Sequence, residues 1–399
     1  MKRMLLVLLA LVFISPMISI GAEKDSISVK LVWEKEIPKG VNDFVFLDEN
    51  GYNVFSVQCK NPEKALKEKR LLMVQGNKLV WYEGDAMRVV KEMTIKGSYA
   101  ISKNGHNIAV LEGLKRNDKG SFEDKPATLR LLNWKGEELA RTQFSPGNLG
   151  LEYITIFPAG NDRTVAINTE GGEGTYRGLK VYSRQGKALK EIFSKSGSGG
   201  EYSEDGSTMF CGIGGRGRVI YDTEFHEIGN FQYHPNRGDY WARISPKGNY
   251  IAEVTTGKSV VIHNKYGKLI SEHHVQGVGN YYGAFSPDEK YLLISPGFRI
   301  IYFFNTNTGN LIWKYEHSED KTSFFPGDVA PDGEFSFIIF TPSREESKWI
   351  WIFNRDGIIV NKIGPLNFTG YSLPIYYVSK TRELFIKLPK KIQLYRINK

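Results

Sequence analysis

The sequence predicts an all-β fold: a β-propeller built from four-stranded blades. The clearest unit runs from Gly283 to Tyr315, where polar or glycine-containing turns divide four short apolar runs. Weaker copies follow one another along the chain, and a repeat of this length indicates a ring of blades. The composition agrees, because 41 glycines and 13% aromatic residues in 399 suit a β-rich chain with many tight turns.

The polar turn between the first and second predicted strands marks each blade. Neighbouring copies lie about 40 to 56 residues apart, the length expected of one four-stranded blade with its loops. Eight such turns predict eight blades. Seven blades is the main alternative, because the first unit, through NKLVWYEGDAMRVVKEM, is hard to divide. The turns end at or near Gly51, Gly105, Asp162, Gly206, Gly248, Glu289, Gly333 and Thr381.

A second set of turns separates the third and fourth strands and supports the same register. Their sequences are NWKGEE, SRQGKA, NKYGKL, NTNTGN and NRDGII, in which glycine supplies the positive φ of a tight hairpin. Helix signals occur in NPEKALKEKR, where Asn61 is expected to cap and Pro62 to take the first helical position. We expect this helix in a loop of the first blade.

The two ends of the chain are expected to share one blade. The last unit supplies PIYYVSK, ELFIKL and KIQLYRI, but no fourth strand. LVWEKEI, from Leu31, resembles LIWKYEH, the fourth strand of the clearest unit. Leu31 to Ile37 is therefore predicted to complete the C-terminal blade and close the ring, which removes two exposed sheet edges.

Residues 1–22 have the pattern of a secretory signal peptide. Lys2 and Arg3 precede an apolar run, and small residues end at Ala22 before charged Glu23. An uncleaved N-terminal anchor is the alternative. We expect residues 23–399 to form a single propeller domain that is secreted or periplasmic and has no transmembrane span after cleavage.

The net charge bears on which class of partner the protein binds. Removal of Lys2 and Arg3 lowers the formal net charge from +9 to +7. Export and the scatter of the lysines argue against nucleic acid as a partner, whereas anionic envelope polymers or lipid head groups remain possible partners.

The two cysteines, Cys59 and Cys211, lie in different repeats, so we expect no disulfide and two small, buried side chains.

One segment carries a family resemblance. FFNTNTGNLIWKYE resembles the repeat of the pyrroloquinoline-quinone (PQQ) propeller superfamily in its Thr308, Gly309 and Trp313, and the SPDG-like turns resemble those of WD-repeat propellers. The resemblance implies the fold of a bacterial repeat propeller. It implies no quinone site, because the adjacent cysteine pair typical of PQQ dehydrogenases is absent and no calcium ligands match. No cofactor and no metal site are expected.

One motif match has a simpler structural explanation, and the histidines match no metal motif. The GxGxxG of Gly212, Gly214 and Gly217 precedes a strand, RVIYD, whereas a dinucleotide site needs a helix there, so we interpret it as a hairpin. The seven histidines show no metal-ligand spacing. No catalytic residues are assigned.

The candidate binding residues lie in the loops between second and third strands and between blades. By propeller geometry these loops crowd one face around the central axis. A mixture of cationic and aromatic groups suits an anionic or carbohydrate-bearing partner. The candidates are Tyr176, Arg177, Arg216, Arg218, His234, Arg237, Asp239, Tyr240, Tyr281, Tyr282 and Arg299.

The sequence therefore predicts an exported, non-catalytic binding module, monomeric, that recognises a protein or a cell-envelope polymer through this loop face. The alternative is a propeller enzyme of the quinoprotein, lactonase or glycan-lyase type, because propellers host both classes. Converging carboxylate, histidine or asparagine groups at the axis would favour the enzyme.

Overall fold

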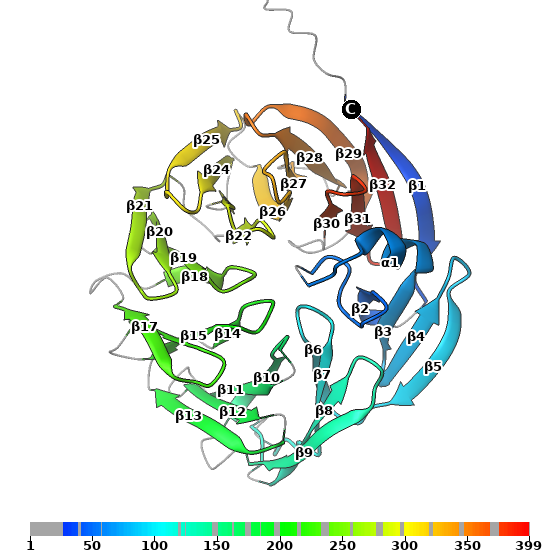
Figure 1. The fold of residues 1–399 in the computed structure, drawn as a ribbon, viewed down its shortest axis with the longest axis vertical. Helices are drawn as coiled ribbons and strands as arrows, with labels where there is room; N and C mark the ends of the chain where they lie inside the picture. Colours follow the sequence, from blue (N-terminus) through cyan, green and yellow to red (C-terminus); the bar gives the residue numbers. More distant parts are fainter. Residues whose placement is uncertain are drawn as a thin grey trace, which may run out of the picture.

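The chain folds into a ring of eight four-stranded antiparallel sheets (Figure 1). This computed structural model describes residues 27–398 apart from 39–40, 57, 119–120, 124, 146–150, 162, 172–176, 184, 195–199, 214–216, 233–238, 256–257, 277–281, 296–298, 319–321, 343–346 and 368–374. The prediction of eight blades is confirmed, and the seven-bladed alternative is wrong because the first unit divides into four strands of its own.

Blades 1 to 4 follow one another in the first half of the chain, with the first strand of each nearest the axis (Figure 1). Blade 1 contains β2 (Val41–Leu47), β3 (Arg70–Gln75), β4 (Lys78–Glu83) and β5 (Arg88–Thr94); blade 2 contains β6 (Ser98–Ile101), β7 (Asn107–Glu112), β8 (Ala127–Asn133) and β9 (Glu138–Phe144); blade 3 contains β10 (Leu151–Pro158), β11 (Thr164–Gly171), β12 (Arg177–Ser183) and β13 (Ala188–Ser194); blade 4 contains β14 (Glu201–Tyr202), β15 (Met209–Ile213), β16 (Gly217–Tyr221) and β17 (Glu227–Phe231).

Blades 5 to 8 complete the ring, and blade 8 takes its outermost strand, β1, from the other end of the chain. Blade 5 contains β18 (Asp239–Ile244), β19 (Tyr250–Thr255), β20 (Ser259–Asn264) and β21 (Leu269–His274); blade 6 contains β22 (Tyr282–Phe285), β23 (Tyr291–Ser295), β24 (Ile300–Asn305) and β25 (Leu311–Glu316); blade 7 contains β26 (Ser323–Val329), β27 (Phe335–Thr341), β28 (Ser347–Asn354) and β29 (Ile359–Asn367); blade 8 contains β30 (Ile375–Val378), β31 (Glu383–Lys387), β32 (Lys391–Asn398) and β1 (Ser28–Glu36).

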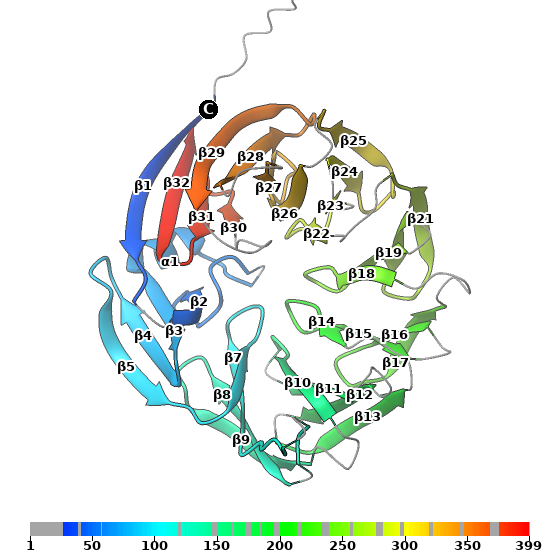
Figure 2. The ribbon, with the colours of Figure 1, turned by 180° about the vertical axis from the view of Figure 1, so that it is seen from behind.

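The N-terminal strand closes the ring as predicted. β1 pairs antiparallel with β32 from Ser28↔Asn398 to Glu36↔Lys391, and the two strands lie side by side in Figure 2. The Glu34 carboxylate accepts hydrogen bonds from Lys391 Nζ at 2.8 Å and from Gln393 Nε2 at 2.6 Å. The observed strand begins three residues before the predicted Leu31.

The hydrophobic core lies between blades rather than within one layer. Each of eight apolar clusters joins two neighbouring blades. On β3, Leu71 and Met73 pack towards blade 8, while Leu72 and Val74 pack towards blade 2. A strand buried on both faces needs a continuous apolar run, which explains why the second strands do not alternate polar and apolar residues.

The outermost strand of every blade carries a β-bulge, near the start of the strand in seven blades and in the middle of β1 in blade 8. The register of each pairing with the third strand skips one apolar residue of the outermost strand. A bulge increases local twist and interrupts the free edge, so the eight outer edges are poor templates for pairing with other chains. The skipped residues are Val32, Val90, Leu139, Leu189, Ile228, Ile270, Ile312 and Val360.

The connections define two rims of the ring. We call the rim that carries the first-to-second and third-to-fourth strand turns the turn rim, and the opposite one the loop rim. The predicted helix is confirmed on the turn rim: α1 (Pro62–Glu68) begins where the Asn61 side chain accepts the Lys64 N–H at 3.1 Å. No helix in the described part of the chain is long and apolar enough to cross a membrane.

Neighbouring turns bind one another around the turn rim. Glu289 stands where five other turns carry glycine and has a φ of 66°. Its buried carboxylate accepts hydrogen bonds from the Ser245 hydroxyl at 2.5 Å and from Asn249 Nδ2 at 2.7 Å, both in the blade 5 turn. The blade 6 turn is thereby fixed to the blade 5 turn.

Deletion of Ser28–Glu36 tests the closure. We expect it to lower the free energy of unfolding by at least about 3 kcal/mol and to cause aggregation, because β32 becomes an exposed edge and the Trp33 packing is lost. Chemical denaturation and sedimentation measure both effects. A synthetic peptide of residues 27–38 added in trans should restore stability, whereas a scrambled peptide should not. Unchanged stability and solubility would disprove closure by β1.

Candidate functional site

The predicted binding residues with a described backbone lie at the loop rim. Within a blade the first and third strands run parallel, so their starts share one rim. Arg177 begins β12, Asp239 begins β18 and Tyr282 begins β22. Arg218 follows one residue into β16, and Arg299 directly precedes β24. These positions spread over blades 3 to 6.

The structure does not describe the side chains of most of the predicted binding residues. Tyr176, Arg216, His234, Arg237 and Tyr281 lie outside the described residues. Arg177, Asp239 and Tyr240 are placed by their backbone alone. A binding role for the loop rim therefore stays a prediction.

Arg218 is buried in an ion pair between blades 4 and 5. Only 1% of the residue is exposed, and its Nε donates to Glu253 Oε1 at 2.9 Å. The guanidinium also lies 5.2 Å from the ring centre of Phe210. Burial raises the pKa of Glu253, and the positive charge of Arg218 opposes that rise. Arg218 thus joins two blades.

Tyr282 and Arg299 are also engaged by neighbouring residues. The Tyr282 ring meets Phe325 of blade 7 edge-on, with 5.0 Å between ring centres. Arg299 donates to the Glu316 carboxylate at 2.6 Å, and the pair holds the pKa of Glu316 below its ordinary value. Both side chains are half-buried, so each contributes to packing at the loop rim.

The segment between β2 and α1 reaches from blade 1 towards the axis of the ring at the turn rim (Figure 1). Phe55 stacks on Tyr376 of blade 8 with 4.3 Å between ring centres. Gln58 accepts from Asn104 Nδ2 of blade 2 at 2.8 Å and donates to the Asp205 carbonyl of blade 4 at 3.4 Å. One segment therefore bridges three other blades.

One carboxyl near the axis joins blades 7 and 8. The Asp328 side chain accepts the N–H groups of Val329 at 2.8 Å and Tyr377 at 2.7 Å. Although it keeps some solvent access, it is densely surrounded by protein, and this burial raises its pKa to about 7. The negative charge of Glu204 adds to the rise. Asp328 thus has a pKa near neutrality, and one of its oxygens makes the blade 7–8 contact while the other binds within blade 7.

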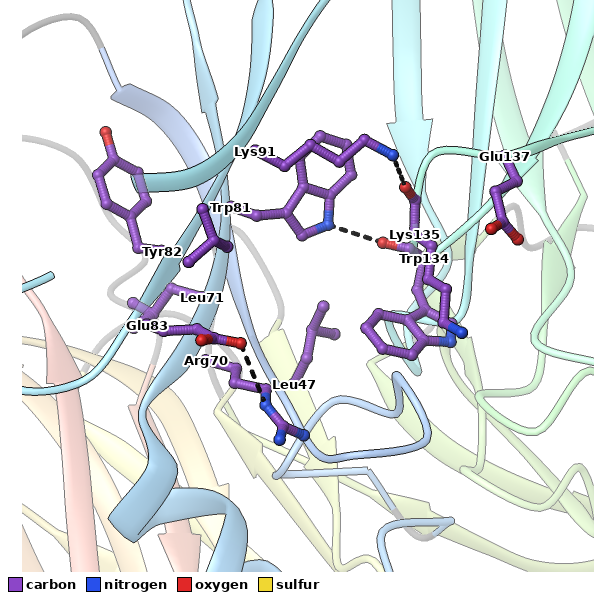
Figure 3. Close-up of a pocket in the computed structure, with 11 residues that line it drawn as sticks. Leu47, Arg70, Leu71, Trp81, Tyr82, Glu83, Lys91, Trp134, Lys135 and Glu137 are labelled. Atoms are coloured by element: carbon purple, nitrogen blue, oxygen red, sulfur yellow. Dashed lines mark hydrogen bonds and ion pairs between the residues drawn. The ribbon is translucent and has the colours of Figure 1, made fainter. Parts of the chain in front are cut away.

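A groove opens on the turn rim between blades 1 and 2 (Figure 3). Its volume is about 300 Å³. Leu47 and Trp81 form a floor that is almost fully buried. The walls are formed by residues of β3, β4 and β5 in blade 1 and of the β8–β9 turn in blade 2. The lining residues are Leu47, Arg70, Leu71, Trp81, Tyr82, Glu83, Val90, Lys91, Trp134, Lys135 and Glu137.

Hydrogen bonds hold the two walls together. Trp81 Nε1 donates to the Trp134 carbonyl at 2.8 Å, and Lys91 Nζ donates to the Lys135 carbonyl (Figure 3). Close approach of the β8–β9 turn needs Gly136, because a Cβ there would lie 2.8 Å from the Trp81 ring. The groove is therefore preformed, with rigid walls.

Both signs of charge surround the groove. Arg70 forms ion pairs with Glu68 at 3.2 Å and with Glu83 at 3.6 Å. Lys91 lies 5.1 Å from the Trp81 ring centre and Lys135 lies 5.3 Å from the Trp134 ring centre. The apolar floor can hold a large side chain, while the rim offers charges to the groups beside it.

Sequence reasoning missed this groove, although one signal was present. In the other seven blades the residue at the register position of Trp81 is aliphatic or phenylalanine. A tryptophan there, followed one blade later by tryptophan in the NWKGEE turn, marks the groove. The equivalent residues are Leu131, Val181, Ile220, Ile262, Phe303, Ile352 and Leu394.

The described residues contain no group of three or more His, Cys, Asp or Glu side chains arranged to hold a metal ion. His263 is buried and stacks on Phe231 with 3.9 Å between ring centres, and burial lowers its pKa to about 4. Cys59 and Cys211 are not joined by a disulfide, and burial raises the pKa of Cys59 to about 12. The histidine and both thiols fit structural positions.

Replacement of Glu253 by Ala tests the blade 4–5 ion pair. We expect the free energy of unfolding to fall by about 3–5 kcal/mol, because Arg218 keeps a buried, uncompensated charge. Glu92→Ala is the control: its exposed pair with Lys78 should contribute less than about 1 kcal/mol. Chemical denaturation of Arg218→Met, of Glu253→Met and of the double variant with both changes completes the test. A double variant as unstable as the sum of the single ones would contradict the pairing.

Comparisons with solved structures agree with the fold. The chain aligns with the C-terminal WD40 domain of Sif2 at 11% identity, over 93% of this chain and 99% of that chain, with a TM-score of 0.56. It aligns with BamB from Moraxella catarrhalis at 11% identity, over 92% of this chain and 100% of that chain, with a TM-score of 0.51. It also aligns with the Myceliophteria thermophila Cps50 (Swd1) propeller at 11% identity, over 93% of this chain and 100% of that chain, with a TM-score of 0.50. No family model and no curated protein matches the sequence. The chain is thus an eight-bladed repeat propeller with a fold of the WD-repeat and PQQ-like type.

Proposed function

We propose that this protein is an exported, non-catalytic interaction scaffold that binds a protein partner through the groove between blades 1 and 2. The groove itself carries the proposal. It combines a buried apolar floor with two tryptophans and an open, charged rim. Anchor pockets for partner side chains combine these features.

The polar atoms of the groove walls are occupied by the protein itself. The Trp81 indole N–H, the Lys91 amine and the Arg70 guanidinium each bind groups of the chain. A partner therefore gains affinity from apolar contact at the floor and from charge at the rim, and needs no rearrangement of the walls. Binding to such a preorganised surface avoids much of the ordering cost of association.

Export rests on the N-terminal pattern of Lys2, Arg3, the apolar run and Ala22. We expect the mature chain to begin near Glu23. Intact-mass analysis of protein purified from its native host measures this directly. A mature protein that retains Met1 would refute cleavage and leave the anchor alternative.

Site-specific photocrosslinking tests the scaffold function. With a photoreactive residue at Glu137, on the groove rim, we expect light-dependent adducts of defined mass in native cells. The control places the same residue at Lys268, which holds the matching position in the blade 5 turn: the N–H of each donates to the first asparagine of its turn. Adducts at Lys268 but not at Glu137, or at neither position, would overturn a protein partner at this groove.

A further inference from the structure

We infer that the groove between blades 1 and 2 binds an extended partner segment in which a large apolar side chain stands next to one or more carboxylates. The inference rests on the proposed function and names the chemistry of the partner. It follows from the charges that remain after internal pairing, from the shape of the floor and from the bulge in β5.

Two lysines supply the charge argument. Lys91 and Lys135 are both exposed, and neither has a carboxylate within ion-pair distance among the described residues. Each ammonium lies over a tryptophan ring of the groove. A cation beside an apolar floor favours a carboxylate next to the anchoring side chain of the partner.

The carboxylates of the groove do not cancel these charges. Glu83 lies within 4 Å of two guanidinium groups, those of Arg70 at 3.6 Å and Arg88 at 3.9 Å. Glu137 also lies on the rim, and its carboxylate accepts from Asn133 Nδ2 at 2.7 Å and forms no ion pair with Lys91 or Lys135 among the described residues (Figure 3). The groove side of the rim is therefore basic.

The bulge in β5 decides how a segment docks. The register passes from Lys91↔Trp81 to Val89↔Tyr82, so Val90 is skipped and lines the groove. An interrupted edge disfavours regular strand addition to β5. Val89 and Val90 are nevertheless 47% and 45% exposed, which extends the apolar surface beyond the floor. Insertion of a side chain, rather than backbone pairing, is the favoured mode.

An anionic polysaccharide is the competing occupant. It would satisfy the lysines but would leave the floor of Leu47 and Trp81 without an apolar partner. A peptide with both features uses the whole groove, which is why we favour it.

Selection from a random peptide library displayed on phage tests the inference. The full mature chain serves as bait, and the selected peptides are then measured against variants by fluorescence polarisation. We expect them to share a Trp, Phe, Leu or Ile next to Asp or Glu. Trp134→Ala should weaken binding by about tenfold or more, because it removes a groove wall. Raised salt should also weaken it.

Two further variants separate binding from folding. Lys135→Glu changes an exposed side chain and leaves the Trp81 and Lys91 hydrogen bonds between the walls in place, and it should weaken binding of the acidic peptides by about tenfold or more. Lys265→Ala with Tyr266→Ala is the matched control, because the blade 5 turn carries a lysine and an exposed aromatic in the reverse order. Its affinity should equal that of the wild type.

The inference would be overturned if no peptide were enriched, or if the enriched peptides lacked acidic residues. It would also be overturned if the groove variants bound the peptides as tightly as the wild type does. A sulfated polysaccharide that binds in place of any peptide, and whose binding depends on Trp134, would overturn it as well. Adducts at Glu137 together with any of these results would leave the scaffold function intact and reject only this partner chemistry. Absence of those adducts would reject the scaffold function separately.

Discussion

Packing between neighbouring blades is the interaction on which the rest of the structure depends. Alternate residues of β3 pack into two different clusters, so blade 1 alone would expose apolar surface on both faces. The same holds for each blade, and only a closed ring covers every face. Closure in turn depends on β1, which covers β32 and brings Trp33 to the blade 8–1 cluster. The two ends of the chain therefore stabilise a core distributed over the whole ring.

The turn rim adds polar cross-links to this apolar ring. Glu289 illustrates the balance of energies, because a positive φ at a non-glycine residue costs on the order of 1 kcal/mol, whereas its carboxylate satisfies donors of the neighbouring turn. Gln58 extends such links to blade 2 through Asn104 and to blade 4 through the Asp205 carbonyl. A rim tied together in this way holds the groove walls in fixed positions, which suits recognition by shape.

Local chemistry explains which features were predictable. Glycine at a positive φ, the cap at Asn61 and the likeness of LVW to LIW are all encoded within a few residues, and the blades, α1 and β1 follow from them. The groove depends on Trp81 and the Trp134 carbonyl, 53 residues apart on adjacent blades, and Arg218 meets Glu253 at a separation of 35. Such contacts depend on how blades pack, so sequence reasoning proposed Arg218 for a partner when it serves an interior ion pair.

The origin of the groove becomes clear from the same position in another blade. At the blade 6–7 contact Phe303 stacks on Trp313, and Trp313 fills the space beside Gly357 of the next turn. At the blade 1–2 contact the register places Trp81 at the Phe303 position and Lys91 at the Trp313 position. Lys91 still reaches the next turn, near Gly136, but its slender chain leaves open the volume that an indole occupies elsewhere. Trp81 and Lys91 thus supply both the apolar floor and a cation at the rim, a pair of residues that no other blade carries at these two register positions.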